Sequence, residues 1–265
     1  MKNLYVVLCV LPALAACKWG KPGKQEHDIN TDTLAFQYKN LVQRAADCGN
    51  KPDSACTVVQ ILYPLFKTEA ALNDTILQRI TALSIVNKNA DTVLKQFAGQ
   101  FLKAYYKDKG SISRHIYYQM QQSVKVIRQD SAITTLQLSS YRFTGGAHGM
   151  SMTTFINWSP RSHTNIYLKD ILINGYAQPL TRIAEKIFRQ QEHLADTASL
   201  KNNYFFKDNK FSLNNNFLIT PTGLRFLYNQ YEIKPYAAGQ TELVIPYAQI
   251  KPLLRPNTVI SQYHL

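Results

Sequence analysis

The chain has 265 residues, 45% of them hydrophobic, and its Lys and Arg outnumber its Asp and Glu to give a formal net charge of +13. A chain of this length can bury a substantial core, as one large domain or two small ones. The charge favours anionic partners such as lipid headgroups, acidic glycans or acidic proteins, but the basic residues are scattered rather than striped, so a nucleic-acid partner is not expected.

The first sixteen residues have the layout of a secretory signal peptide. Lys2 gives a positive start, residues 4–16 are almost entirely apolar, and two alanines precede Cys17. The apolar run is shorter than the roughly 20 residues that a membrane span needs. The end of the run also resembles the bacterial lipobox, which predicts that residues 1–16 are removed and that Cys17 carries lipid. The alternative is an ordinary cleaved signal with a chance cysteine.

Export would leave a basic chain on a flexible tether. Removing the leader takes away Lys2 and changes the charge from +13 to +12. Residues 17–32 are polar and contain two glycines, which is typical of a flexible segment between a lipid and a domain. We therefore expect attachment to an envelope membrane through lipid on Cys17, with the inner or outer membrane left open.

Two cysteines remain in the part of the chain that is expected to fold. Cys48 and Cys56 flank a turn-rich segment, residues 49–55. In an oxidising compartment such a pair is expected to form one disulfide, although two free buried thiols are the alternative. Two cysteines without clustered histidines do not match a structural zinc site, and no metal or cofactor is expected.

The first half of the folded part predicts helices around one strand. A helix is expected from Thr33 to Asp47, and residues 57–66, rich in Val, Ile, Leu and Tyr, predict a strand. A helical stretch follows, with one apolar face made of Leu72, Ile76, Ile80 and Leu83. A clearer helix is expected to be capped by Asp91 and to end at Gly110, with its apolar residues at helical spacing: Leu94, Phe97, Ala98, Phe101, Leu102 and Tyr105.

The second half changes to a strand-like period. Residues 124–128, 133–143 and 150–158 predict three strands, with Met152, Thr154, Ile156 and Trp158 on one face of the last. One amphipathic helix follows, with Leu180, Ile183, Ala184 and Ile187 inward and Arg182, Glu185, Lys186 and Arg189 outward. Strands are then expected over residues 223–230 and 243–247. The order of elements favours an α+β fold with an antiparallel sheet packed against amphipathic helices.

The run from Tyr141 to Gly149 holds the first candidate site. Gly145 and Gly146 fall between two expected strands, where paired glycines permit positive φ or a close backbone approach, and His148 sits at the turn. The functional interpretation is a rim that contacts a ligand. The structural interpretation is a tight hairpin whose histidine makes a local hydrogen bond.

The second candidate site is the run from Tyr228 to Gly239. It contains Tyr228, Tyr231, Glu232 and Tyr236 together with an amide pair. Tyrosine rings and adaptable amides suit contact with a glycan or a protein, because the ring offers apolar area and a polar tip. The alternative is a strand edge whose tyrosines fill the core.

These two strings together resemble the RsiV C-terminal-like family, catalogued as a domain of unknown function. Residues 33–140 resemble its N-terminal companion domain, and residues 141–265 resemble the RsiV-like half; the two halves also suit one compact unit. The resemblance rests on six segments: residues 59–64, 72–73, 143–149, 166–171, 224–239 and 244–247.

The resemblance implies an extracytoplasmic α+β module. In one branch the module is the ectodomain of a lysozyme-sensing anti-sigma factor, and in another it precedes a peptidoglycan deacetylase domain. This sequence departs from both, since no sigma-binding part or deacetylase domain is recognised in it. Lysozyme is itself usually basic, so a chain of charge +12 would be repelled at long range.

Catalytic motifs are weak in this sequence. His115, His148, His163 and His193 are widely spaced without a His-x-x-x-His pair, so zinc hydrolysis is not expected. No Gly-x-Ser-x-Gly elbow appears. A pair formed by His148 and Glu232 would suit acid–base chemistry only if folding brings the two side chains together.

The sequence therefore predicts an envelope-anchored, non-catalytic module that binds a cell-wall glycan or an extracytoplasmic protein. The alternatives are a peptidoglycan-active hydrolase that uses His148 and Glu232, a lysozyme-binding sensor or inhibitor, and a purely structural lipoprotein. The expected binding residues are Gly145, Gly146, His148, Tyr228, Tyr231, Glu232 and Tyr236.

Overall fold

The computed structural model describes residues 34–111 and 117–263. All of these residues belong to one compact unit, Asp32–Leu265. The expected signal peptide, Cys17 and the tether lie outside the described residues, as does His115. Within the described ranges, no helix combines the length and the apolar character needed to cross a membrane.

The larger of the two sheets has six strands in the order in which they occur along the chain. Its strands are β1 (Phe36–Arg44), β2 (Val58–Phe66), β3 (Gln119–Gln129), β4 (Thr134–Phe143), β5 (Met150–Ser159) and β6 (Thr164–Asn165). Neighbouring strands are antiparallel except β2 and β3, which run parallel. The boundary expected between residues 140 and 141 falls inside β4, so this sheet takes strands from both predicted halves.

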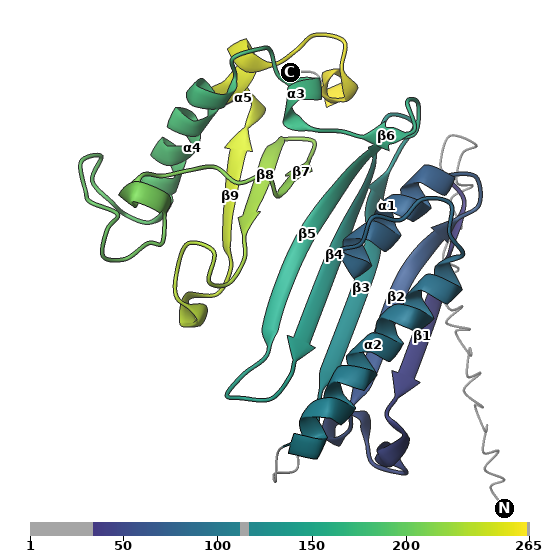
Figure 1. The fold of residues 1–265 in the computed structure, drawn as a ribbon. Helices are drawn as coiled ribbons and strands as arrows, with labels where there is room; N and C mark the ends of the chain where they lie inside the picture. The colour runs from purple at the N-terminus through teal and green to yellow at the C-terminus, as the bar shows by residue number, and fades with distance from the viewer. Residues whose placement is uncertain (1–33, 112–116, 264–265) are drawn as a thin grey trace, which may run out of the picture. The chain divides into compact units, whose positions relative to one another are not determined.

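Two helices lie across one face of this sheet (Figure 1). They are α1 (Ala70–Thr81) and α2 (Ala90–Ser111), and they form the crossover that two parallel strands require. Their apolar faces pack on the sheet around Ile61, Ile156 and Trp158, none of which is more than 2% exposed. The predicted period of α2 is confirmed, because Leu94, Ala98, Phe101 and Tyr105 are buried.

A second core forms in the C-terminal part of the chain. The smaller sheet is antiparallel and contains β7 (Phe217–Ile219), β8 (Gly223–Tyr228) and β9 (Thr241–Pro246). The helices of this part are α3 (Leu168–Ile171), α4 (Ala177–Gln191) and α5 (Tyr247–Ile250). Helix α4 buries Leu180 and Ala184 as predicted, packs the partly buried Ile183 and Ile187 against this core, and also buries Phe188, which was not predicted. The α+β fold class is confirmed.

The helix expected from Thr33 to Asp47 is wrong, because the chain forms strand β1 there. Every residue of β1 pairs with β2, from Phe36 opposite Phe66 to Arg44 opposite Val58. The rings of Phe36 and Phe66 lie 5.2 Å apart between centroids. Because β1 is an edge strand and only partly buried, its sequence does not alternate clearly between apolar and polar residues. Pairing with β2 overrides the local helix propensity of this segment.

Smaller differences concern where elements begin and end. Helix α1 stops at Thr81, and Ala82 takes a left-handed conformation with φ of 56°. Leu83 therefore leaves the predicted apolar face and is 52% exposed. The side chain of Asn89, rather than Asp91, accepts the hydrogen bond from Thr92 N at the start of α2 (3.0 Å). The short strands β6 and β7 are not predicted by the sequence.

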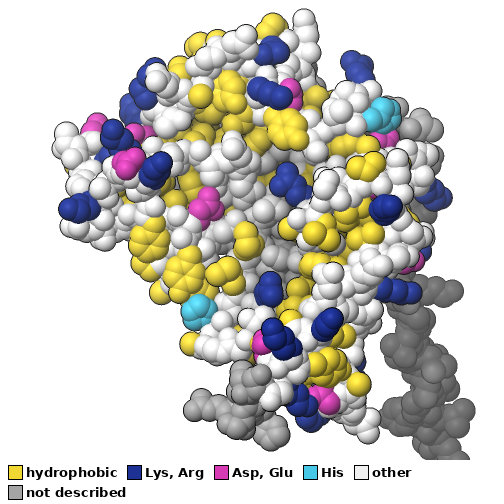
Figure 2. All heavy atoms as spheres, viewed as in Figure 1, with side chains coloured by type: hydrophobic (Ala, Val, Ile, Leu, Met, Phe, Trp, Pro, Cys, Tyr) yellow, Lys and Arg dark blue, Asp and Glu magenta, His cyan; other side chains and the backbone are white. Residues whose placement is uncertain are grey.

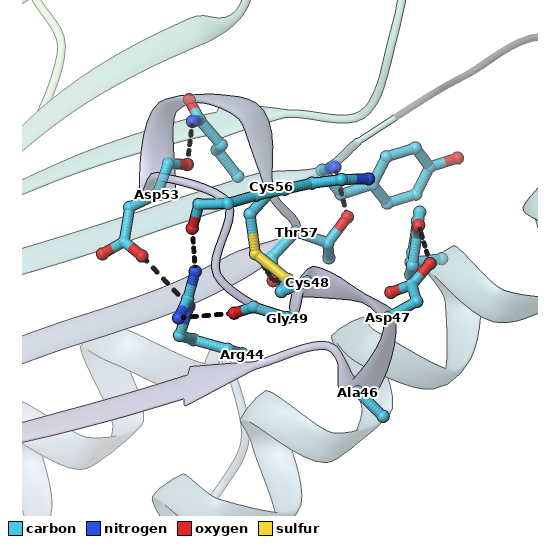
Figure 3. Close-up of a disulfide and its surroundings, with 12 residues drawn as sticks. Arg44, Ala46, Asp47, Cys48, Gly49, Asp53, Cys56 and Thr57 are labelled. Atoms are coloured by element: carbon cyan, nitrogen blue, oxygen red, sulfur yellow. Dashed lines mark hydrogen bonds and ion pairs between the residues drawn. A yellow bond between two sulfur atoms is a disulfide. The ribbon is translucent and has the colours of Figure 1, made fainter.

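The loop between β1 and β2 is closed by the predicted disulfide (Figure 3). The Cα atoms of Cys48 and Cys56 are 5.4 Å apart, within the usual range for a disulfide. Arg44 also crosses this loop to the Asp53 carboxylate (3.1 Å) and the Gly49 carbonyl (3.4 Å). Closing so short a loop contributes about 2–3 kcal/mol to stability, which helps to fix the edge of the six-stranded sheet.

Candidate functional site

The outer edge of β5 has almost no strand partner. Strand β6 pairs only with Trp158 and Ser159, whereas the rest of that edge carries backbone groups that need hydrogen bonds. The side chain of Asn229 supplies two of them at Thr153, accepting from its N–H (2.7 Å) and donating to its carbonyl (3.1 Å). Asn216 accepts from the N–H of Phe155 (3.1 Å).

Asn157 of β5 makes the reciprocal contact, in which its side chain binds the backbone of β7. Its amide donates to the Phe217 carbonyl and accepts from the Ile219 N–H, each at 2.9 Å. We call Asn157, Asn216 and Asn229 the amide clasp. Beside it Phe155, Leu218 and Leu227 form a small buried cluster. Together these contacts fasten β7 and β8 to the edge of β5.

The amide clasp brings together the two candidate segments that the sequence predicts, residues 141–149 and 228–239. The β4–β5 turn carries His148, and the β8–β9 connection carries Tyr231 and Tyr236. The rings of His148 and Tyr236 are stacked with centroids 3.9 Å apart, and Tyr231 lies 6.2 Å from His148 and 5.5 Å from Tyr236. We call these three residues the aromatic cluster; His148 is exposed and Tyr231 is 46% exposed.

The conformation of the β4–β5 turn depends on its paired glycines. Gly145 and Gly146 have φ of 88° and 95°, a region that strains any residue with a Cβ atom. The turn holds the His148 ring through its Nδ1, which lies 3.1 Å from the Gly149 carbonyl. That carbonyl can only accept, so Nδ1 is the donor of this hydrogen bond.

Glu232 fixes the turn that presents Tyr231. One of its carboxylate oxygens accepts from the Asn229 N–H and the other from the Asn214 amide, each at 2.7 Å. Tyr231 has φ of 63° in this turn, which costs energy for a bulky side chain and is found at binding sites. Among the described residues, Glu232 makes no hydrogen bond or ion pair with His148.

Tyr228 and Asn229 differ from the role expected of them. Tyr228 is 1% exposed, and its hydroxyl donates to the Ser212 carbonyl (2.8 Å) inside the C-terminal core. Burial raises the pKa of this hydroxyl above its usual value, so it remains a donor. Asn229 is 8% exposed and belongs to the amide clasp rather than to an adaptable surface.

The turn carrying His148 also lies at one end of a cavity of about 770 Å³. The cavity lies between the C-terminal part of α1, the middle of α2 and the ends of β3, β4 and β5. Figure 2 shows a hollow on this face, with hydrophobic and Lys or Arg side chains along it. Across the described residues, no group of three or more His, Cys, Asp or Glu is arranged to hold a metal ion.

Sequence reasoning missed Asn157 and Asn216, the centre of the amide clasp. Asn157 is 4% exposed and lies between the buried residues Ile156 and Trp158 of β5. A polar side chain at such a position needs a hydrogen-bond partner, so an asparagine between two apolar residues of a predicted strand indicates a structural contact. The partner itself, more than sixty residues away for Ile219, is not visible in the sequence.

Two family models match separate parts of the chain. Residues 50–151 match the model described as deacetylase PdaC, and residues 169–248 match the model described as a protein of unknown function, DUF3298. The peptidoglycan-N-acetylmuramic acid deacetylase PdaC of Bacillus subtilis strain 168 is 22% identical over 179 residues. That alignment covers 65% of this chain and 38% of the deacetylase, so the chain spans well under half of its relative.

Two solved structures share the fold. A member of the DUF3298 family from Bacteroides fragilis NCTC 9343 has a TM-score of 0.71 and 22% identity, covering 87% of this chain and 98% of that one. A DUF3298 family protein from Pseudomonas aeruginosa PAO1 has a TM-score of 0.66 and 24% identity, covering 84% of this chain and 95% of that one.

The amide clasp leads to a prediction about stability. Replacing Asn216→Ala leaves the Phe155 N–H without its partner, so we expect the free energy of unfolding to fall by about 2 kcal/mol. Urea denaturation of the full chain measures it. Asn215→Ala is the matched control, because this neighbouring side chain is exposed and makes no hydrogen bond among the described residues. Equal unfolding midpoints for the two variants would contradict a structural role for the clasp.

Proposed function

We propose that this chain is an envelope-anchored, non-catalytic module that binds a cell-wall glycan through its aromatic cluster. The observation that carries the proposal is the meeting of His148, Tyr231 and Tyr236, which come from two distant segments. Stacked rings with polar tips are the kind of surface on which sugars pack, since the flat apolar area and the hydrogen-bonding groups lie side by side.

The state of the tyrosine hydroxyls supports this function. Buried tyrosines of this protein donate to internal acceptors, as Tyr228 does to Ser212 and Tyr204 does to Glu192. The hydroxyls of Tyr231 and Tyr236 have no hydrogen-bond partner within residues 34–111 and 117–263. Both are therefore available to a ligand, and the cost of holding Tyr231 at positive φ fits a residue positioned for contact.

The relatives support a role connected with the cell wall. The name of the B. subtilis relative states a peptidoglycan substrate, and the resemblance to the RsiV C-terminal-like family implies an extracytoplasmic module. Because the chain spans 38% of that deacetylase, the relative supports the setting and the polymer rather than its reaction.

The contacts of Glu232 favour binding over catalysis. A general acid or base needs a carboxylate that can exchange a proton with the substrate, but both oxygens of Glu232 accept hydrogen bonds that hold the turn. The alternative hydrolase would have to break these contacts. A lysozyme-binding sensor is the other alternative, and the mature charge of +12 disfavours a basic partner.

The proposal includes attachment to an envelope membrane through lipid on Cys17. Lys2, the apolar run and the small residues before Cys17 support it, together with the polar segment that follows. One acyl chain gives only marginal membrane binding, whereas lipoprotein processing supplies several chains on one cysteine. The tether then lets the domain reach polymer beyond the membrane surface.

Replacing the two tyrosines of the aromatic cluster, Tyr231→Ala with Tyr236→Ala, should weaken binding to purified peptidoglycan sacculi about tenfold, as expected from the loss of about 1.4 kcal/mol of ring contact. Co-sedimentation of the detergent-solubilised full chain measures the apparent dissociation constant. Tyr167→Ala is the matched control, because Tyr167 is 50% exposed against 46% for Tyr231.

Two outcomes would overturn the proposed function. The first is wild-type protein that does not sediment with sacculi above the level of the double variant. The second is the release of soluble fragments from sacculi by wild type, since that would make the chain a hydrolase. Circular dichroism of each variant shows whether the fold is kept.

The anchor predicts a change of fractionation. Cys17→Ser should move the protein from membranes to the soluble fraction at physiological salt, or leave it with an uncleaved leader, because the lipid is lost. Basic residues near the surface add only about 1 kcal/mol each and are screened by salt. Wild type should remain with membranes through a high-salt wash and leave with detergent. Mature wild type that washes off in salt alone would show that Cys17 carries no lipid.

A further inference from the structure

A groove runs from the aromatic cluster along the helix-covered face of the larger sheet. The cavity of about 770 Å³ beside His148 adjoins a second cavity of about 370 Å³, and both are lined by Ala82, Gln122, Ser140 and Met152. The two cavities therefore form one continuous depression. We call it the basic groove, because Arg142 and Arg79 line it and no Asp or Glu does.

The floor of the groove follows from the strand register. Across three neighbouring strands Gln122 lies opposite Ser140, and Ser140 lies opposite Met152. One step further toward the turn, Arg142 lies opposite Met150. Further along the same face, Ile156 is buried under the helices, whereas Met150 and Met152 are 47% and 46% exposed. The helices thus leave one end of this face open.

The walls of the groove come from α1, α2 and the β4–β5 turn. Phe97, Gln100 and Phe101 of α2 form one side. At one end the groove is lined by Gly145 and His148, and the ring of His148 stacks on Tyr236. A ligand in the groove would therefore reach the aromatic cluster without leaving the surface.

The charge of the groove is of one sign. Arg142 lines the larger cavity and Arg79 the smaller, and no Asp or Glu lines either of them. Both arginines are exposed, and neither takes part in an ion pair among the described residues. The guanidinium of Arg142 lies 5.6 Å from the Phe101 ring centroid, which positions it. Unpaired arginines in such a groove complement carboxylates.

The groove also offers a hydrogen-bond acceptor that lacks a donor. The Oε1 atom of Gln122 is buried and has no hydrogen-bond partner within the described part of the chain. An amide oxygen in this state needs an N–H or O–H group. Acetamido and hydroxyl groups of an N-acetylated sugar supply such donors, and the exposed methionines adapt to an irregular apolar face.

We propose that the basic groove binds an N-acetylated glycan strand that carries carboxylates, with Arg79 and Arg142 as the carboxylate contacts. This inference rests on the proposed function and names the polymer that the same site would take. The strand extends from the aromatic cluster along β4 and β5. Its acetamido groups approach Gln122, and its carboxylates meet the two arginines.

Paired ligands test the inference by isothermal titration calorimetry on the full chain. One probe is a tetrasaccharide of alternating N-acetylglucosamine and N-acetylmuramic acid, whose lactyl groups carry carboxylates. The other is chitotetraose, which has the N-acetylglucosamine backbone without carboxylates. Wild type is expected to bind the acidic tetrasaccharide about tenfold more tightly, with an advantage that falls as salt rises.

Variants separate the arginines from the rest of the surface. Arg79→Gln with Arg142→Gln should remove the tenfold preference, so that the acidic tetrasaccharide binds no more tightly than chitotetraose. Arg182→Gln is the matched control, because Arg182 is an exposed arginine of α4 outside the groove. The conservative pair Arg79→Lys with Arg142→Lys should restore part of the preference, which loss of folding would not allow.

The remaining outcomes distinguish a failure of the carboxylate contacts from a failure of the proposed function. Equal binding of both tetrasaccharides by wild type, unaffected by the double Gln variant, overturns the carboxylate contacts while the proposed function stands. Binding of neither tetrasaccharide overturns both. Tighter binding of a poly(glycerol phosphate) chain than of the acidic tetrasaccharide, lost in the double Gln variant, overturns the assignment to carboxylates in favour of phosphates.

Discussion

The architecture of this protein depends on the need to satisfy the unpaired edge of β5. Strand β4 occupies one side of β5, but β6 covers only two residues on the other. Buried backbone groups without partners cost about 1–3 kcal/mol each. The amide clasp supplies those partners with side chains, since Asn216 and Asn229 bind the backbone of β5 and Asn157 binds that of β7. Side-chain amides thus join two sheets that share no strand ladder.

The candidate site is a consequence of that joint. His148 and Tyr236 are far apart in the chain, but their rings stack. The stacking is possible because Asn229, which directly follows β8, binds the backbone of β5 at Thr153. Glu232 and the paired glycines then set the two turns themselves. A binding surface built in this way is pre-organised, which lowers the entropy lost when a ligand binds. The basic groove begins at the same turn, so one rigid framework supports both surfaces.

Local patterns in the sequence predicted the elements whose burial is regular. Strand β2 is predicted from its run of apolar residues, and helices α2 and α4 are predicted from apolar residues at helical spacing. Strand β1 was predicted as a helix because an edge strand is half exposed and its pairing with β2 is a tertiary effect. The parallel pairing of β2 with β3 and the cross-sheet role of Asn216 are likewise contacts between distant residues, which no local pattern contains.

The candidate site was predicted only in part, because it too depends on contacts between distant residues. Turn chemistry identified the segments that carry His148, Tyr231 and Tyr236, but composition alone did not separate Tyr228, which fills the core, from the two tyrosines of the aromatic cluster. Glu232 was expected among the binding residues; it is exposed, and its two carboxylate oxygens accept the hydrogen bonds that close a turn. Arg79 and Arg142 carry no motif in the sequence, and they share a groove only because α1 lies over this sheet.

The central claim is that two distant segments form one glycan-binding surface. It is tested most directly by NMR of the full chain, isotope-labelled at tyrosine and histidine, during titration with the acidic muramyl tetrasaccharide. The account predicts that the ring signals of His148, Tyr231 and Tyr236 shift together along one binding curve while those of buried Tyr228 stay in place. Saturation of the ligand with no shift in this cluster, or with shifts confined to other tyrosines, would contradict it.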